Sequence, residues 1–381
     1  MTTPTPAAAA EHYLDNAATT RPCEEAVEAA LEQMRHFGNP SSGHRPGLAA
    51  ERALKLARRR VADALHTAPE QITFTGSGTE ASNMALSGLA DRRRGNRIVS
   101  TDAEHPAVLN TLRQLEQQGF ELVLLPTLGG LPDLEQAERL IDQNTALVAA
   151  MMVNNETGAI FPVVELGRMA RAAGARYHID AVQAFGKLPF DPKALGCDTL
   201  AVSAHKVGGL KGVGALWRAE KLHLPPLIHG GGQEGNLRSG TENMPGIAAF
   251  GAAVESLPRR YSAARVAALS AEALRRLEAL GCVANRPPQA VPDILNISAP
   301  GYRAEPMLTA LSERGVYLSA GSACSARSKR HSGVLAAMGL AEHLLASALR
   351  VSFGAESTEA DVEALVRGIE SCMAVLVREK F

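Results

Sequence analysis

Residues 146–183 read ALVAAMMVNNETGAIFPVVELGRMARAAGARYHIDAVQ, and this stretch decides the fold class. It opens with an uninterrupted apolar run, continues with an amphipathic helical pattern over 163–173, and returns to a short apolar run at 177–180. A strand, a helix and a second strand in this order are typical of a βαβ unit, in which the two strands lie parallel in one sheet. The stretch therefore predicts an α/β fold.

The same alternation extends to both sides of this stretch. We expect further strands at 72–75, 97–101, 121–126, 199–202 and 214–217, and helices from about 79, from about 106 and over 133–141. Together with 146–153 and 177–180 these runs predict a seven-stranded, mostly parallel sheet with helices on both faces. Binding sites of such sheets lie at the carboxyl ends of the strands.

The pattern changes near residue 252, and the rest of the chain predicts a smaller α+β domain. We expect a long helical region over 252–280, strands at 293–298 and 316–318, a helix over 305–314 and an amphipathic helix over 359–377. We place the large domain at 12–255 and the small domain at 256–381, with residues 1–11 nearby.

Composition narrows the class of partner and compartment. The 381 residues carry a net charge of −1, which argues against nucleic acid or a membrane surface as the main partner. The five cysteines are far apart and lack the spacing of zinc ligands, so we expect no metal site and a reducing compartment. Residues 1–10 lack the basic start and apolar core of a signal peptide, which favours the cytoplasm.

A glycine-rich turn follows the first predicted strand. Gly76-Ser77-Gly78-Thr79 opens a helix, and free backbone N–H groups at a helix start can hold a phosphate. The alternative is a plain turn in which Thr79 caps the helix. Taken alone, the motif does not decide between the two.

Other strands end in polar residues of the same kind. His105 follows the 97–101 strand, where it could stack on a ring or simply cap the next helix. Asn154 and Asn155 follow the 146–153 strand as ligand-binding amides or as a polar turn.

Two further residues carry the decisive chemistry. Asp180 ends the 177–180 strand, and a buried carboxylate there needs a facing cation such as a pyridinium, unless it only caps a helix. Lys206 follows the 199–202 strand among small residues, where desolvation makes an amine able to form a Schiff base. A surface lysine before a glycine turn is the alternative. Because consecutive strands each supply such a group, we predict pyridoxal phosphate as the cofactor.

In these residues the chain resembles the cysteine desulfurases of the NifS/IscS type, pyridoxal phosphate enzymes of the class V aminotransferase family. The matching motifs run almost end to end: Tyr13-Leu14-Asp15-Asn16-Ala17-Ala18, Gly38-Asn39-Pro40-Ser41-Ser42, Glu104-His105, Asn154-Asn155-Glu156-Thr157-Gly158, Asp180-Ala181-Val182-Gln183, Ser203-Ala204-His205-Lys206, Gly230-Gly231-Gly232-Gln233-Glu234, Arg238-Ser239-Gly240-Thr241 and Gly321-Ser322-Ala323-Cys324. The resemblance implies the fold of type I pyridoxal phosphate-dependent transferases.

The resemblance also implies a role for each matching position. Lys206 would hold the cofactor and later move the Cα proton, with His105 stacked on the ring. The other expected cofactor contacts are Gly78, Thr79, Ser203 and His205 at the phosphate, Asp180 at the pyridine nitrogen, Gln183 at the phenolic oxygen, Asn155, and Thr241 at the phosphate of a neighbouring subunit, which implies a homodimer. Asn39, Asn155 and Arg350 would bind the carboxylate of L-cysteine.

Cys324 would be the nucleophile that takes the sulfur. It lies in a segment without apolar periodicity, which predicts an exposed loop, and cations such as Arg327 and Lys329 favour its thiolate. We interpret Cys23, Cys197, Cys282 and Cys372 as structural. The residues after Cys324 depart from the family pattern and leave the sulfur acceptor open. Gly235-Asn236 stand where the family commonly has Arg-Gly, which removes a charge near the expected dimer interface.

Three other interpretations stay open from the sequence. A selenocysteine lyase or an aminotransferase of the same fold would share Lys206 and Asp180, and an aminotransferase would not need Cys324. A non-catalytic sulfur-trafficking protein could keep the fold, although the intact Lys206, Asp180 and His105 argue against it. The acceptor could serve iron–sulfur cluster assembly, tRNA thiolation or DNA phosphorothioation.

Overall fold

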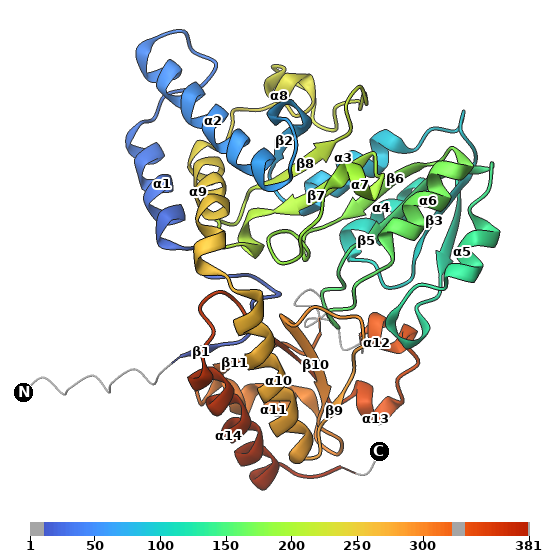
Figure 1. The fold of residues 1–381 in the computed structure, drawn as a ribbon, viewed down its shortest axis with the longest axis vertical. Helices are drawn as coiled ribbons and strands as arrows, with labels where there is room; N and C mark the ends of the chain where they lie inside the picture. Colours follow the sequence, from blue (N-terminus) through green and yellow to red (C-terminus); the bar gives the residue numbers. More distant parts are fainter. Residues whose placement is uncertain (1–10, 322–331, 380–381) are drawn as a thin grey trace, which may run out of the picture. The chain divides into compact units, whose positions relative to one another are not determined.

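The computed structural model describes residues 11–321 and 332–379, which divide into two compact units (Figure 1). The larger unit comprises Thr19–Asn155 and Ala159–Arg260, and the smaller one comprises Glu156–Gly158 with the described parts of Met1–Ala18 and Tyr261–Phe381. The division after Arg260 lies five residues beyond the predicted boundary at 255/256 (260 − 255), and residues 12–18 group with the smaller unit.

The larger unit is built on a seven-stranded sheet in the order β2-β8-β7-β6-β5-β3-β4. Its strands are β2 (Ile72–Thr75), β3 (Arg97–Thr101), β4 (Glu121–Leu125), β5 (Thr145–Met151), β6 (Arg176–Asp180), β7 (Thr199–Ser203) and β8 (Gly214–Arg218). Only β8 runs antiparallel to its neighbours β2 and β7, and the other pairs are parallel. The predicted seven-stranded, mostly parallel sheet is confirmed.

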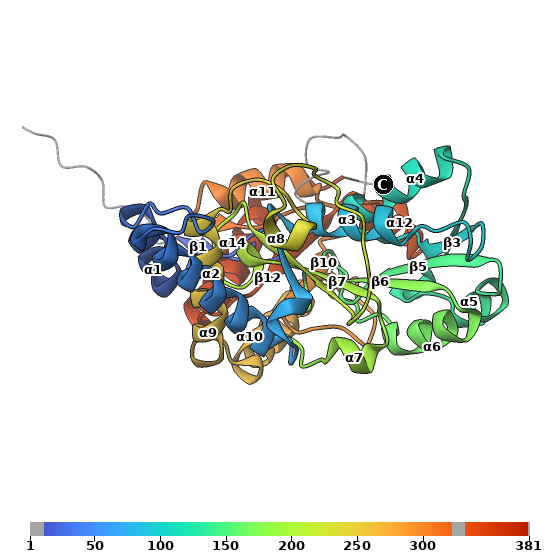
Figure 2. The ribbon, with the colours of Figure 1, turned by 90° about the horizontal axis from the view of Figure 1, so that it is seen from above.

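Helices cover both faces of this sheet (Figure 2). The helices of the larger unit are α1 (Glu24–Arg35), α2 (Arg45–Ala64), α3 (Gly78–Leu89), α4 (Pro106–Gln117), α5 (Leu134–Leu140), α6 (Val163–Ala173), α7 (Pro192–Leu195), α8 (Gln233–Asn236) and α9 (Met244–Arg260). Helices α3 and α4 lie on one face, and α5, α6 and α7 lie on the other. Every residue of β5 is buried because it has a helical layer on each side.

Helices α1 and α2 of the larger unit both pack against α9 (Figure 1). Ala26 and Ala30 of α1 are buried against Ala249 and Ala253 of α9, and such small side chains let the helix backbones approach closely. A methyl group on Gly251 of α9 would lie only 2.8 Å from the Cα atom of Ala57 in α2.

The helical region predicted over 252–280 consists of two helices with a break between them. Helix α9 ends at Arg260 and α10 (Ala263–Ala279) begins after Ser262, whose side chain caps it by accepting the Arg265 N–H. Between them the hydroxyl of Tyr261 donates to the carboxylate of Asp293, with oxygen–oxygen distances of 2.8 and 3.0 Å. The Ala/Leu spacing continues through this point and therefore hides the break.

The smaller unit packs helices against short sheets. Its elements are β1 (His12–Tyr13), α10, β9 (Val283–Ala284), β10 (Ile294–Ser298), α11 (Ala304–Ser312), β11 (Val316–Tyr317), α12 (Gly333–Ala337), α13 (Glu342–Leu345), β12 (Ala348–Ser352) and α14 (Glu359–Val375). Strands β12, β10 and β9 form an antiparallel sheet whose apolar side chains share one core with α10, α11 and α14. Strand β1 pairs parallel with β11, which groups residues 12–18 with this unit.

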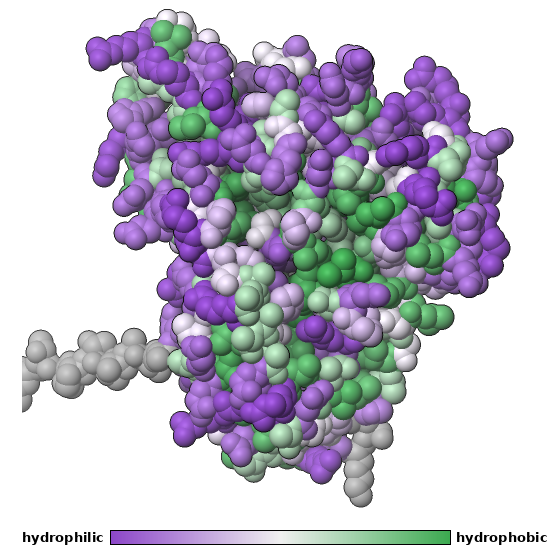
Figure 3. All heavy atoms as spheres, viewed as in Figure 1, coloured by the Kyte–Doolittle hydropathy of each residue, from purple (hydrophilic) through white to green (hydrophobic). Residues whose placement is uncertain are grey.

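Charged and polar side chains cover the outer surface around α2 and α8 on the face drawn in Figure 3. Within residues 11–321 and 332–379, no helix has the length and apolar character needed to cross a membrane.

We expect Gly251→Val to lower the free energy of unfolding by about 2 kcal/mol, because its side chain would push α2 away from α9. Gly43→Val is the matched control, since a methyl group at Gly43 would meet no atom within 4 Å. Urea unfolding of both variants measures the difference, and equal losses would contradict the close helix packing.

Candidate functional site

The turn between β2 and α3 is held by backbone contacts that only glycine allows. Ser77 caps α3, since its side chain accepts the Glu80 N–H at 3.1 Å, so the cap is Ser77 and Thr79 lies in the first helical turn. A methyl group on Gly78 would lie 2.7 Å from the Val182 side chain, and one on Gly214 would lie 2.5 Å from the Ser77 backbone. The start of α3 therefore packs directly against the segment after β6 and the start of β8.

Ser203 and His205 stand beside this turn, at and just after the end of β7. The Ser203 Oγ atom is buried and has no hydrogen-bond partner among the described residues. The Nδ1 atom of His205 lies 3.2 Å from the Thr19 hydroxyl, and burial lowers the pKa of His205 to about 4. His205 is thus neutral at physiological pH. The Ser203 hydroxyl is a buried donor that has no acceptor among the described residues.

Asp180 ends β6, and its carboxylate is 8% exposed. Burial raises its pKa, while His105, the backbone N–H of Val182 at 2.9 Å, and Lys206 favour the charged form. A buried carboxylate needs positive charge close by, and these neighbours supply part of it.

His105 is the N-cap of α4, and its Nδ1 atom accepts the Ala107 N–H at 3.1 Å. Burial lowers the pKa of His105, the charge of Lys206 lowers it further, and that of Asp180 opposes them. An accepting Nδ1 on a neutral ring leaves the proton on Nε2. The capping role and the ligand-facing role, which the sequence left as alternatives, are compatible because the cap fixes the ring.

Lys206 closes a one-turn helix, Ala204–Lys206, directly after β7. It is half-buried, and its charge affects the pKa values of Asp180, His105 and His205. The structure therefore brings four of the predicted residues together at the carboxyl ends of β3, β6 and β7.

The other predicted residues of the larger unit differ from one another in exposure and in hydrogen-bond partners. Asn155 is half-buried after β5, and Gln183 is buried, with its Oε1 atom accepting from the Lys187 ammonium at 3.3 Å. Asn39 and Thr241 are exposed, and the Asn39 side chain accepts the Ser41 N–H at 2.9 Å. Asn154 is buried and donates to the Ala103 carbonyl, which gives it a role in holding the turn.

Arg350 lies on β12 of the smaller unit and is 1% exposed. Its guanidinium donates to Asp15 Oδ1 at 2.8 Å, and Asp15 Oδ2 accepts from the Ser319 hydroxyl at 2.8 Å. A guanidinium that already holds one carboxylate has the geometry that recognises carboxylates. Cys324 lies outside the described residues.

Comparison with known proteins places this arrangement in a family. Residues 12–365 match the model of the family described as Aminotransferase class-V. The chain belongs to this family. Class V aminotransferases and cysteine desulfurases are families of pyridoxal phosphate enzymes.

Similar class V proteins carry names from sulfur chemistry. The chain is 38% identical to Cysteine desulfurase IscS of Methanosarcina thermophila, over 92% of this chain and 89% of the relative. A solved NifS-like protein superposes with a TM-score of 0.89 at 35% identity, covering 96% of this chain and all of that one. A structure described as SspA in complex with cysteine has a TM-score of 0.80 at 34% identity, over 91% and 100% of the two chains.

The residues of this class V chain fit the cofactor of the family. Ser203 offers a buried hydroxyl without a partner among the described residues, as a phosphate ligand requires. Asp180 offers a buried carboxylate to a ring nitrogen. The close packing around Gly78 leaves no room for a side chain where α3 begins.

The four described cysteines are buried and form no disulfide. Burial raises the pKa of Cys197, of Cys372, and of Cys282 to about 11, so these thiols stay protonated at neutral pH. Only Cys372 lies inside a helix, and the other three stand at or just before the start of an element. Such thiols are poor nucleophiles.

Glu104 is a functional candidate that the sequence motif named without a role. Its Oε1 atom accepts from the Thr101 hydroxyl and from the Met151 N–H, both at 2.9 Å, while Oε2 is buried without a partner among the described residues. Burial, together with the charge of Asp180, raises the pKa of Glu104 to about 8. Two neighbouring carboxyls with different protonation are typical of functional sites.

Two ion pairs also escaped the sequence interpretation. Arg58, Arg59 and Arg60 form a basic run in the sequence, and such a run predicts a solvated face. This prediction is wrong for Arg58, which is 18% exposed and pairs with Glu234. The carboxylate of Glu234 is almost fully buried, which draws the arginine inward. The second pair joins Arg238 to Glu80, and the Ser-x-x-Glu spacing of Ser77 and Glu80, a capping signature, could have revealed half of it.

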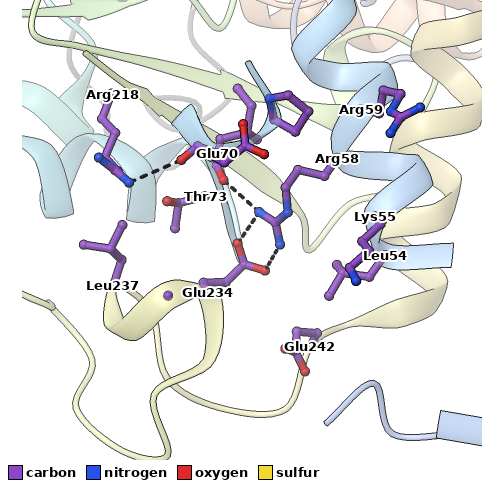
Figure 4. Close-up of a pocket in the computed structure, with 13 residues that line it drawn as sticks. Leu54, Lys55, Arg58, Arg59, Glu70, Thr73, Arg218, Glu234, Leu237 and Glu242 are labelled. Atoms are coloured by element: carbon purple, nitrogen blue, oxygen red, sulfur yellow. Dashed lines mark hydrogen bonds and ion pairs between the residues drawn. The ribbon is translucent and has the colours of Figure 1, made fainter. Parts of the chain in front are cut away.

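The Arg58–Glu234 pair borders a pocket of about 560 Å³ (Figure 4). Lys55, Arg59, Arg218 and Glu242 line the same pocket. None of the described site residues predicted from the sequence lines it, so this pocket is separate from the Lys206 cluster.

Glu104→Gln should remove a pH-dependent loss of stability. The unfolded carboxyl ionises near 4.5 and the folded one near 8, so between these values rising pH increasingly favours the unfolded chain. We expect the variant to gain on the order of 3 kcal/mol over wild type between pH 5 and pH 8. Thermal unfolding across this range measures the difference, with Glu116→Gln, at an exposed position of α4, as control. Parallel wild-type and Glu104→Gln profiles would contradict a neutral Glu104.

Proposed function

We propose that the chain is a pyridoxal phosphate-dependent cysteine desulfurase. It would take sulfur from L-cysteine, release L-alanine and carry the sulfur as a persulfide on Cys324. The observation that carries this proposal is the cluster of Lys206, Asp180 and His105, in which the charge of Lys206 affects the pKa values of the other two, in a chain 38% identical to a cysteine desulfurase.

The cofactor would be held by groups that the described structure already orients. Gly78, Thr79, Ser203 and His205 would bind its phosphate, with the Ser203 hydroxyl as a buried donor. Asp180 would face the ring nitrogen, His105 the ring and Gln183 the phenolic oxygen. When bound, the cofactor supplies an electron sink for the substrate Cα.

Lys206 would remove the Cα proton of L-cysteine and return a proton later in the reaction. Its place at the strand ends next to Asp180 and His105 supports this role, because a proton acceptor must stand within reach of the reacting carbon. The neutral ring of His105 would leave Lys206 as the mobile-proton group nearest to the substrate.

Cys324 would act as the nucleophile. Its thiolate sulfur would attack the sulfur of L-cysteine, forming a sulfur–sulfur bond as the sulfur–Cβ bond breaks. The electron pair of the broken bond would remain with the carbon skeleton, which leaves as L-alanine after protonation. The burial of the four described cysteines supports this assignment, since none of them presents an accessible thiolate.

Arg350 and Asn155 would bind the substrate carboxylate, with Asn39 nearby. Arg350 already pairs with Asp15, so the substrate would share or take over that guanidinium. A bidentate guanidinium–carboxylate contact would also fix the orientation of the amino acid.

The proposal extends to a homodimer and to a sulfur acceptor. Thr241 is exposed between α8 and α9, as a residue that reaches a neighbouring subunit must be. The acceptor would be a thiol-bearing protein, with an iron–sulfur scaffold, a tRNA thiolation protein or a DNA phosphorothioation protein as candidates. The free cysteines accord with a reducing compartment such as the cytoplasm.

Cys324→Ser should abolish persulfide formation and turnover of L-cysteine to L-alanine, while visible absorbance of the bound cofactor persists. Cys372→Ala, which removes a buried helical thiol, is the control and should keep both. Product analysis by mass spectrometry measures persulfide and alanine. Unchanged alanine formation by Cys324→Ser would favour a selenocysteine lyase type of reaction, and amino transfer to a 2-oxo acid would favour an aminotransferase.

Ser203→Ala should weaken pyridoxal phosphate binding about tenfold or more, because a hydrogen bond to a charged group is lost. The cofactor-free protein should keep its stability, since the hydroxyl has no partner among the described residues. Titration by absorbance measures the first effect and urea unfolding the second, with the buried Ser270→Ala as control. An unchanged dissociation constant would remove Ser203 from the phosphate site.

A further inference from the structure

Two ion pairs join the α8 loop, residues 229–243, to α2 and to the start of α3. Their loop residues, Glu234 and Arg238, lie four positions apart. Glu234 accepts from Arg58 in a bidentate pair, with distances of 2.6 and 2.7 Å, and also accepts the Phe74 N–H at 2.8 Å (Figure 4). Phe74 belongs to β2, which leads directly into Gly76 and the start of α3. The first pair therefore holds the loop against the strand that carries the turn.

The backbone of the α8 loop needs such support. Glu234 and Asn236 have positive φ values of 49° and 67°, and Gly235 between them has 65°. Left-handed conformations cost non-glycine residues about 1–2 kcal/mol each. The strain persists because ion pairs hold the surroundings in place. The left-handed backbone also accounts for the presence of Gly235 and Asn236, because glycine and asparagine tolerate this conformation best.

The second pair acts on the turn itself. Arg238 donates to Glu80 from Nε at 2.8 Å and from Nη2 at 3.3 Å. Glu80 Oε2 also accepts the Gly76 N–H at 2.9 Å, so one carboxylate holds both the loop and the glycine that opens the turn. Both side chains are partly shielded, at 24% and 18% exposure, which limits screening by water.

Glu80 places a negative charge on the first turn of α3, the turn proposed to bind a phosphate. Without compensation, that charge would repel the phosphate, because like charges a few ångströms apart interact strongly near a protein surface. Arg238 cancels it, and the hydrogen bonds from Arg238 to Glu80 raise the pKa of the guanidinium in turn.

We propose that Arg238 is a positioning residue for the cofactor phosphate: it neutralises Glu80, fixes the Gly76 turn and couples that turn to the loop that carries Thr241. This inference rests on the proposed function, since it requires a phosphate ester at the start of α3. Arg238 acts through Glu80 and Gly76, so its effect depends on Glu80 being charged.

The experiment compares Arg238→Met, Glu80→Gln and the double variant in titrations with pyridoxal phosphate and with pyridoxal, which lacks the phosphate. The readout is the ratio of the two dissociation constants from visible absorbance. Arg238→Met should lower the preference for the phosphorylated ligand by on the order of tenfold, because Glu80 is then uncompensated. Glu80→Gln should change it by less than about threefold, and the double variant should recover most of the loss.

Two further measurements distinguish the effect of the Arg238 charge from a general loss of local structure. The loss in Arg238→Met should shrink with added salt, since screening weakens the repulsion. Arg238→Lys keeps the charge and should keep most of the preference, which provides a test if the methionine variant does not fold. Arg275→Met, which breaks an exposed bidentate pair with Glu272 in the smaller unit, is the matched control.

Equal losses for pyridoxal and pyridoxal phosphate in Arg238→Met, or no recovery in the double variant, would overturn the inference and leave the pair a structural clamp. If Arg238→Met does not fold, Arg238→Lys provides the test. A loss of about tenfold in its preference for pyridoxal phosphate over pyridoxal would overturn the inference. Failure of the wild-type chain to bind either ligand would overturn the proposed function together with this inference. Normal wild-type binding with an unaffected Arg238→Met preference would overturn the inference alone.

Discussion

The carboxylate of Asp180 is the constraint on which the larger unit depends. It is 8% exposed at the end of β6, where an ionised group is costly unless positive charge faces it. Lys206 and His105 come from the ends of neighbouring elements and favour its charged form. The parallel sheet makes this possible, because parallel strands deliver their carboxyl ends to one edge.

Burial sets the charge of the groups around Asp180. His105 and His205 are driven toward the neutral form, and Glu104 toward the protonated form. Because these groups are uncharged, the strong electrostatic contacts of the site involve Asp180 and Lys206. Farther out, charge is retained but paired, as in Arg238 with Glu80 and Arg58 with Glu234.

Local patterns predicted much of the sheet and its site. The helix expected over 163–173 is α6, and the buried strands before and after it are β5 and β6. His105, Asp180 and Lys206 were singled out because each stands at or after the end of an apolar run, and their functional role stays a prediction. The break at Tyr261 inside the helical region expected over 252–280 was not predicted, because the apolar spacing continues across Tyr261. Its bond to Asp293 reaches 32 positions along the chain, which a local pattern does not show.

Sequence patterns were sufficient to predict the order of strands and helices and the family to which the chain belongs, and they pointed to candidate site residues at the strand ends. Three features depend on tertiary packing: Arg58 lies inward, the Glu104 carboxyl accepts the Met151 N–H, and Glu80 joins Gly76 to Arg238. These contacts join residues 47 to 176 positions apart, apart from the local Glu80–Gly76 bond. The periodicity of the sequence predicts which face of a helix or strand a residue occupies. Its contact partner on that face depends on how distant segments pack together.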